Sequence, residues 1–228
     1  MQNYLTEFIG TFFLVLTIGL TVIGGTPLAP LAIGSSLMIM VYMGGHVSGG
    51  HYNPAVTLGV YLRGKMASSA EVVGYMVSQV LGAVVAALAV HAITGKTFAP
   101  APSPDATTSA ALVVEFLYTF ALVLVVLNSA ASARTQGNSF YGLAIGFTIV
   151  VAAFAGGPVS GGAFNPAVGI GPILVQKLLG GGPAGQLWLY LVGPLLGGAV
   201  AAAVFGMQER PEVQLHAEPS RIPEGRPS

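Results

Sequence analysis

A stretch of twelve residues occurs twice in this chain. Residues 45–56 (GHVSGGHYNPAV) and 157–168 (GPVSGGAFNPAV) are identical at nine of twelve positions, at an offset of 112 residues. Weaker similarity extends to both sides, where Glu7 corresponds to Glu115. A match of this length indicates a duplicated structural unit that covers most of the chain. Further matched pairs are Phe8 with Phe116, Tyr75 with Tyr190, and Gly82 with Gly197.

The chain is too apolar and too poor in charge for a water-soluble protein. Of its 228 residues, 54% are hydrophobic and 7% are charged, against about 25% charged residues in typical soluble domains. The mean hydropathy is +0.77, so this surface needs the hydrocarbon core of a bilayer as its solvent. A net charge of zero gives no basis for nucleic-acid binding, and the absence of cysteine excludes disulfides, thiolate catalysis and iron–sulfur clusters.

Six apolar runs approach the length of about 20 residues that crosses a bilayer. Two shorter segments, residues 53–62 and 165–179, are too short or too glycine-bounded to cross, and we predict re-entrant half-helices there. Residues 209–228 hold seven of the sixteen charged residues and four prolines, a composition typical of a disordered hydrophilic tail. The six predicted membrane-spanning helices are residues 4–23, 28–44, 72–93, 110–127, 140–154 and 187–207.

The prediction is therefore an all-α membrane protein with one domain, residues 1–208. Its two repeats, about 4–94 and 110–208, each hold three spans and one half-helix. Because three is an odd number, the second repeat enters the membrane from the opposite side, so the repeats are inverted and both half-helices dip toward the midplane. Both termini then share one side, which the positive-inside rule makes cytoplasmic, with six basic residues against two. The six are Arg63, Lys65, Arg134, Arg210, Arg221 and Arg226, and the two are Lys96 and Lys177.

The Asn-Pro-Ala sequence in each copy is a helix start, because Asn is a favoured N-cap and Pro loses nothing at the first helical position. Helices that begin at Asn53 and Asn165 direct two positive dipole ends, each about half an elementary charge, at the membrane centre. Neutral molecules can pass this point while the Asn amides donate to their oxygens, whereas cations and protons are repelled. Glu7 and Glu115 cost about 2.5 to 3.5 kcal/mol each within apolar spans. We expect each carboxylate to accept N–H groups from the loop of its own repeat.

These motifs resemble those of the aquaporin and glycerol-facilitator family of membrane channels. Residues 46–57 (HVSGGHYNPAVT) fit the family's loop motif at every defined position, and the resemblance covers about residues 4–207. It implies a right-handed bundle of six transmembrane helices and two half-helices, with a pore in each subunit of a homotetramer in the cell membrane. The pore motifs that it implies are Asn53, Pro54, Ala55, Asn165, Pro166 and Ala167.

The chain departs from this family at the expected narrowest point of the pore. Family members usually carry Arg three residues after the second Asn, where this chain has Val168. The resemblance assigns the other selectivity-filter positions to Ile33, Ala153 and Gly162. This wide, apolar filter favours water together with larger neutral solutes such as glycerol, urea, metalloid acids such as arsenite, and organoarsenicals. Similar arginine-lacking channels occur with bacterial arsenic-detoxification systems, and short loops without an organelle signal suggest a bacterial plasma membrane.

Two other classes of membrane protein remain open. An ion-coupled transporter can also use inverted repeats and broken helices, but it needs titratable groups on its pathway. A non-conducting scaffold would pass no solute. An enzyme is not expected, because Asp105 is the only aspartate and no nucleophile with base and orienter can be assembled.

The remaining polar and aromatic candidates have structural interpretations. His46 and His51 have no third donor, so we expect a role in the loop or the pore backbone, and neither a metal nor a cofactor. Two Gly-x-x-x-Gly pairs, beginning at Gly142 and Gly193, are interpreted as close helix contacts within the chain. Tyr190, near a span end, is assigned with Tyr4 and Trp188 to the interfacial aromatic belt.

Overall fold

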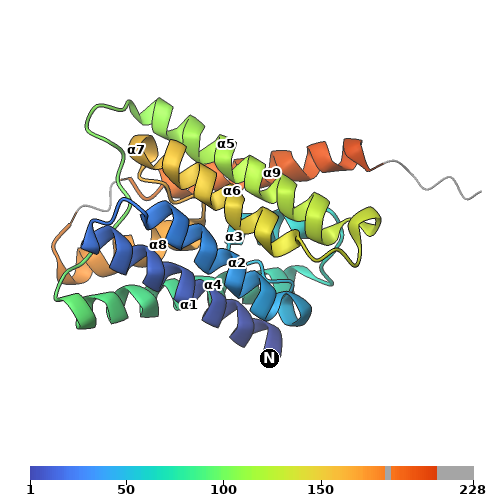
Figure 1. Ribbon diagram of the computed structural model, residues 1–228, viewed down its shortest axis with the longest axis horizontal. Coiled ribbons are helices and arrows are strands. Elements are labelled where there is room, and N and C mark those ends of the chain that lie inside the picture. The colour runs from blue at the N-terminus through green and yellow to red at the C-terminus, as the bar shows by residue number, and fades with distance from the viewer. Residues whose placement is uncertain (183–185, 210–228) are drawn as a thin grey trace, which may run out of the picture.

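The computed structural model describes residues 1–182 and 186–209, and this part of the chain is helical without strands (Figure 1). The predicted tail beyond Glu209 lies outside the described residues. The spans are α1 (Gln2–Gly24), α2 (Ala29–Ser48), α4 (Ser69–Thr94), α5 (Thr108–Val126), α6 (Tyr141–Ala155) and α9 (Leu189–Gln208), and the half-helices are α3 (Pro54–Leu62) and α8 (Pro166–Leu179). Short helical turns occupy α7 (Gly157–Ser160), η1 (Leu127–Ala131) and η2 (Ala133–Thr135).

The predicted fold class is confirmed, with each element within a few residues of its expected bounds. Five of the described helices are long and apolar enough to cross a membrane. The sixth span, α6, has only 15 residues, a rise of about 22 Å against the roughly 30 Å of a hydrocarbon core. The short helix α7 continues it beyond a break at Gly156.

The break between α6 and α7 distinguishes the second repeat from the first. In the first repeat, α2 runs without interruption to Ser48. In the second repeat, the position of His46 is taken by Pro158, which has no N–H to donate to the preceding turn. The helix therefore restarts at Gly157, and the sequence analysis did not predict this restart.

Small residues let the spans pack in pairs, α1 on α4, α5 on α9 and α2 on α6. A Cβ atom on Gly82 of α4 would lie 2.5 Å from the Phe8 carbonyl oxygen, and one on Gly197 of α9 would lie 2.5 Å from that of Phe116. The two contacts are equivalent in the two repeats. Gly142 and Gly146 face α2, and Gly193 faces α5, so the prediction of intrachain contacts for these glycines is confirmed.

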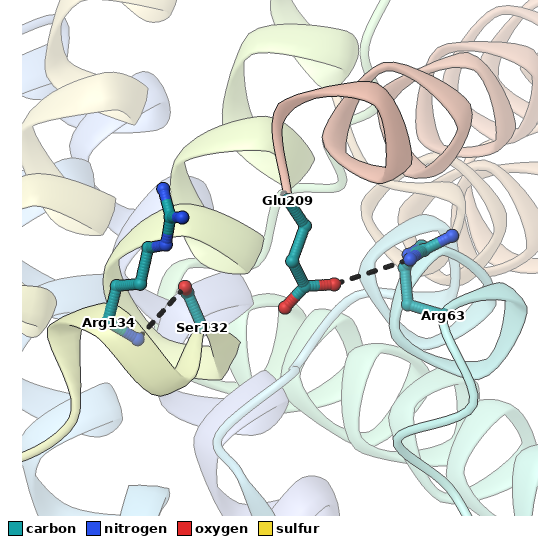
Figure 2. A network of polar contacts seen from close by, with 4 residues as sticks. All are labelled: Arg63, Ser132, Arg134 and Glu209. Atoms are coloured by element: carbon teal, nitrogen blue, oxygen red, sulfur yellow. Dashed lines mark hydrogen bonds and ion pairs between the residues drawn. The ribbon is translucent and has the colours of Figure 1, made fainter. Parts of the chain in front are cut away.

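The beginning of the chain and the end of α9 lie at the same end of the molecule (Figure 1). The end of half-helix α3 meets the end of α9 there, where Arg63 pairs with Glu209 at 3.3 Å and lies 5.6 Å from the centre of the Phe205 ring. Figure 2 shows this pair beside Arg134, whose backbone N–H donates to the Ser132 hydroxyl. This end of the bundle therefore carries Arg63 and Arg134, as the inverted topology requires.

Candidate conduction pathway

The two half-helices begin at the Asn residues that the sequence indicates. Asn53 and Asn165 both have extended backbone conformations and act as N-caps. The Oδ1 atom of Asn53 accepts the Ala55 N–H at 2.8 Å, and that of Asn165 accepts the Ala167 N–H at 2.9 Å. Proline follows each cap at a helical position that needs no N–H donor. The motif residues Ala55 and Ala167 are fully buried.

The remaining polar atoms of the two Asn side chains join the repeats to each other. Asn53 Nδ2 donates to the Phe164 carbonyl at 2.9 Å, and Asn165 Nδ2 donates to the Tyr52 carbonyl at 2.8 Å. This reciprocal bonding holds the two helix N-termini against each other inside the protein. Each amide has a second N–H, so one donor per Asn is left for a molecule in the pathway.

Tyr52 and Phe164, which precede the two Asn residues, have an uncommon backbone conformation. Their φ angles are +48° and +49°, in the left-handed region that non-glycine residues enter at a cost of about 1 to 3 kcal/mol. The conformation turns each carbonyl toward the opposite repeat and each N–H toward a glutamate. Neither residue was predicted from the sequence, although an aromatic residue precedes Asn-Pro-Ala in both copies and was the available signal.

Glu7 accepts hydrogen bonds from four donors in and beside the first loop. Its Oε1 accepts the Ser48 hydroxyl at 2.7 Å and the His51 N–H at 2.9 Å. Its Oε2 accepts the Tyr52 N–H at 2.6 Å and Gln79 Nε2 at 2.7 Å. Glu7 thus contacts the loop of its own repeat, and these four donors offset the burial of the carboxylate.

Glu115 does the same in the second repeat with one donor fewer. It accepts the Ser160 hydroxyl at 2.8 Å and the N–H groups of Ala163 and Phe164 at 2.9 and 2.6 Å. The position equivalent to Gln79 is Pro194, which has no side-chain donor. Both glutamates are fully buried and committed to the loops, which leaves neither free on the pathway.

Two buried tyrosines fix the helix ends that lead into the loops. The Tyr75 hydroxyl donates to the Ser48 carbonyl at 2.8 Å, and the Tyr190 hydroxyl donates to the Ser160 carbonyl at 2.6 Å. The assignment of Tyr190 to the aromatic belt was wrong, because this side chain is completely buried. Its match with Tyr75 in the repeat was the signal for a shared structural role.

A cavity of about 250 Å³ runs beside both Asn residues. All four predicted filter positions line it, and the lining within the described part of the chain contains no Asp, Glu, Lys or Arg. The lining extends from Val22 and Pro30 near one end of the bundle to Val126 and Ile145 toward the other. The four predicted filter positions on this lining are Ile33, Ala153, Gly162 and Val168.

His51 is the one predicted histidine that lines this cavity. Its Nδ1 lies 3.1 Å from the Thr57 hydroxyl, which in turn donates to the Asn53 carbonyl. His46, by contrast, is exposed. Within residues 1–182 and 186–209, no group of three His, Asp or Glu side chains could hold a metal ion.

Comparison with known proteins agrees with this geometry. Residues 1–205 match the Major intrinsic protein family. The chain is 36% identical to Aquaporin NIP1-4 of Oryza sativa subsp. japonica, over 91% of this chain and 77% of that protein. It is 34% identical to Glycerol uptake facilitator protein-like 6 of Lactiplantibacillus plantarum, over 89% of this chain and 95% of that protein. The X-ray structure of the aquaglyceroporin from Plasmodium falciparum has the same fold, with a TM-score of 0.78, 22% identity, and coverage of 90% of this chain and 94% of that chain.

The fold and the paired half-helices define a multi-pass membrane channel of the aquaporin and aquaglyceroporin type, for water and small solutes. The chain belongs to the Major intrinsic protein family. The two relatives named above are an aquaporin and a glycerol uptake facilitator, and both names describe transport proteins.

Proposed function

We propose that this channel passively conducts neutral solutes larger than water, namely glycerol, urea and metalloid acids such as arsenous acid, together with organoarsenicals. The observation that carries the proposal is the lining of the cavity at its four filter positions. Ile33, Ala153, Gly162 and Val168 supply apolar or no side chains. A filter without a guanidinium offers more width and removes the fixed charge that a permeating molecule would meet.

The Asn residues supply polar contact within this apolar lining. A hydroxylated solute can accept the free N–H of Asn53 and of Asn165 while its carbon or metalloid centre contacts apolar walls. Such a pathway suits molecules with both polar and apolar surface, as small-molecule sites generally do. Glycerol and arsenous acid both carry several hydroxyl groups on a small neutral centre.

Cation exclusion rests on the half-helices in this proposal. The N-termini of α3 and α8 meet in the protein interior, each with a partial positive charge of about half an elementary charge. Half-helix dipoles of this kind exclude protons and cations in aquaporin-type pores. Because no arginine adds to them here, rejection of cations depends on these dipoles alone.

We further propose a homotetramer in a bacterial plasma membrane, with both termini cytoplasmic and residues 1–208 as a single channel domain. Arg63, Lys65 and Arg134 at one end of the bundle support this orientation through the positive-inside rule. Large apolar side chains such as Leu81, Leu117 and Leu196 are exposed on the spans, which fits contact with lipid and with neighbouring subunits.

Val168→Arg tests the assignment of the filter. The guanidinium would occupy the cavity beside Asn165, so we expect glycerol and arsenous acid uptake to fall about tenfold more than water uptake. This factor corresponds to a difference of about 1.4 kcal/mol in the activation free energy of permeation. Val168→Met is the matched control, since it adds length without charge. The measurement is light-scattering uptake by proteoliposomes, with a membrane-potential dye to record ion leak.

The results separate the competing functions. Solute uptake that saturates and follows a proton or sodium gradient would favour a coupled transporter. Absence of any solute flux would favour a scaffold. An unchanged ratio of solute to water uptake in the Val168→Arg variant would contradict the filter assignment.

A further inference from the structure

The segment between α4 and α5 has an unusual sequence. Residues 97–105 contain Pro100, Pro102 and Pro104 in alternation, so that Ala101 and Ser103 carry the only backbone N–H groups within that proline run. Proline fixes φ near −65° and makes such a segment stiff. Figure 1 shows the chain between α4 and α5 crossing one end of the bundle, on the side of α7. We call residues 97–105 the proline strap.

The proline strap is anchored to the bundle at its beginning. Phe98 is 8% exposed and packs against Gly19 of α1. A Cβ atom added to Gly19 would lie 2.5 Å from the Phe98 ring. The same position is 2.6 Å from Val90 of α4. The hydroxyl of Thr97 lies beside Gly180, directly after α8. The proline strap therefore has a fixed starting point on three helices.

From this anchor, the proline strap reaches α7 and the turn that follows it. The Ser103 N–H donates to the Val159 carbonyl at 3.0 Å. A Cβ atom on Gly161 would lie 2.5 Å from both the nitrogen and the oxygen of Ala101. Contact between the strap and the turn is thus backbone against backbone, with no flexible side chain that could absorb a displacement.

The opposite side of the same turn faces the cavity. Gly162 lines the cavity at a filter position, and a Cβ there would lie 3.1 Å from the Gly157 Cα. The turn consequently has little room toward α7, while the proline strap limits its movement in the other direction. The position of the Gly162 backbone depends on both contacts.

We propose that the proline strap is a specificity-determining element of the channel, which holds Gly162 in place through Ala101 and Ser103 and so sets the width of the filter. This inference rests on the proposed function, because it concerns the solute size that the filter admits. When the strap is displaced, the turn gains freedom to move outward and larger neutral solutes pass. Ala101 and Ser103 act as positioning residues, since Ser103 contacts α7 and Ala101 contacts the turn.

The first repeat provides an internal control because no segment within residues 1–182 and 186–209 packs on its equivalent turn as the proline strap does on the second. Gly49 has a φ angle of +89° and Gly161 one of +87°, so alanine is strained to the same degree at both positions. Among the described residues, a Cβ on Gly49 would meet only the His51 ring, at 3.1 Å. Gly161 itself lines the cavity and Gly49 does not. A difference between Gly49→Ala and Gly161→Ala therefore reports the contact with Ala101 only where Ser103→Pro, at a residue outside the lining, changes the uptake in the same direction.

The experiment compares water, glycerol and xylitol uptake by proteoliposomes that contain the full chain. Gly161→Ala forces the strap outward, and Ser103→Pro removes the N–H that binds Val159. We expect both variants to raise the ratio of xylitol to glycerol uptake about fivefold, the factor that corresponds to the net free energy of one hydrogen bond. Gly49→Ala and Ser103→Ala, which keeps the N–H, should leave this ratio unchanged.

Hydrogen exchange of a peptide that covers the proline strap gives a second measurement without transport. The Ser103 amide should be protected in the wild type and in Gly49→Ala, and should lose protection in Gly161→Ala. Equal ratios of xylitol to glycerol uptake in Gly161→Ala and Gly49→Ala, or unchanged exchange in Gly161→Ala, would overturn the inference. A wild-type protein that takes up no glycerol would instead overturn the proposed function, a result that the exchange pattern distinguishes from failure of the strap contact.

Discussion

At the scale of single residues, the two buried glutamates decide whether the loops can form. Glu7 receives four donors on two oxygens, an arrangement that only a carboxylate can satisfy. Glutamine has one acceptor oxygen, and its NH₂ group would face two of these donors. We expect Glu7→Gln to lower the free energy of unfolding by about 3 kcal/mol, since buried donors are left unpaired.

Thermal unfolding in detergent measures this effect. Glu71→Gln is the matched control, because Glu71 accepts a single N–H, from Ala67, in an exposed position. The glutamine oxygen can replace that contact. Equal losses of stability in the two variants would contradict this prediction. They would show that the four donors around Glu7 add no more stability than the single exposed contact of Glu71.

The glutamates and the Asn residues could be predicted from the sequence because each recurs in the second repeat together with its neighbouring residues. Their partners were harder to find, since a partner is chosen in three dimensions. Gln79 binds Glu7 across 72 positions of sequence and has no counterpart in the second repeat. The positive φ angles of Tyr52 and Phe164 follow from contacts to the opposite repeat, and local preferences for these residues point to other conformations.

At the scale of elements, hydropathy and caps were sufficient to place the spans and half-helices. The restart at α7 was not predicted, because the predicted span ended at residue 154 and no helix was expected between it and the half-helix that begins after Asn165. The close packing of α5 on α9 depends on the missing side chains of Gly193 and Gly197. An added Cβ on Gly197 would lie 2.5 Å from the Phe116 oxygen and 2.8 Å from the Phe120 nitrogen.

Gly197→Ala should therefore separate α5 from α9 and destabilise the channel. Overpacking costs about 1 to 3 kcal/mol, which exceeds the gain of up to about 1 kcal/mol from the better helix propensity of alanine. Gly24→Ala is the control, since no atom of the described part of the chain lies within 4 Å of a Cβ at that position. A midpoint of thermal unfolding that falls for Gly197→Ala and holds for Gly24→Ala is the expected result. A higher midpoint for Gly197→Ala would show that the interface has room for a methyl group.

At the scale of the whole molecule, the inverted repeat makes the two ends of the bundle nearly equivalent in fold, so orientation depends on charge. The described basic residues near the end of α9 are Arg63, Lys65 and Arg134, and the opposite end carries Lys96 and Lys177. The positive-inside rule assigns the end with this small excess of basic residues to the cytoplasm. Hydropathy alone could not have chosen between the two orientations, because both bury the same spans.

The absence of cysteine from the chain makes the orientation directly measurable with single introduced thiols. Thr26→Cys, between α1 and α2, and Ala67→Cys, between α3 and α4, are both exposed and leave the charge unchanged. With the termini cytoplasmic, a membrane-impermeant maleimide should label Cys at position 26 in intact cells, and at position 67 only after permeabilisation. The cysteine-free wild type supplies the background signal. The reverse pattern of labelling would place the termini outside. Labelling of both positions in intact cells would indicate insertion in two orientations. In that case, the small charge difference between the ends would be insufficient to fix a single orientation.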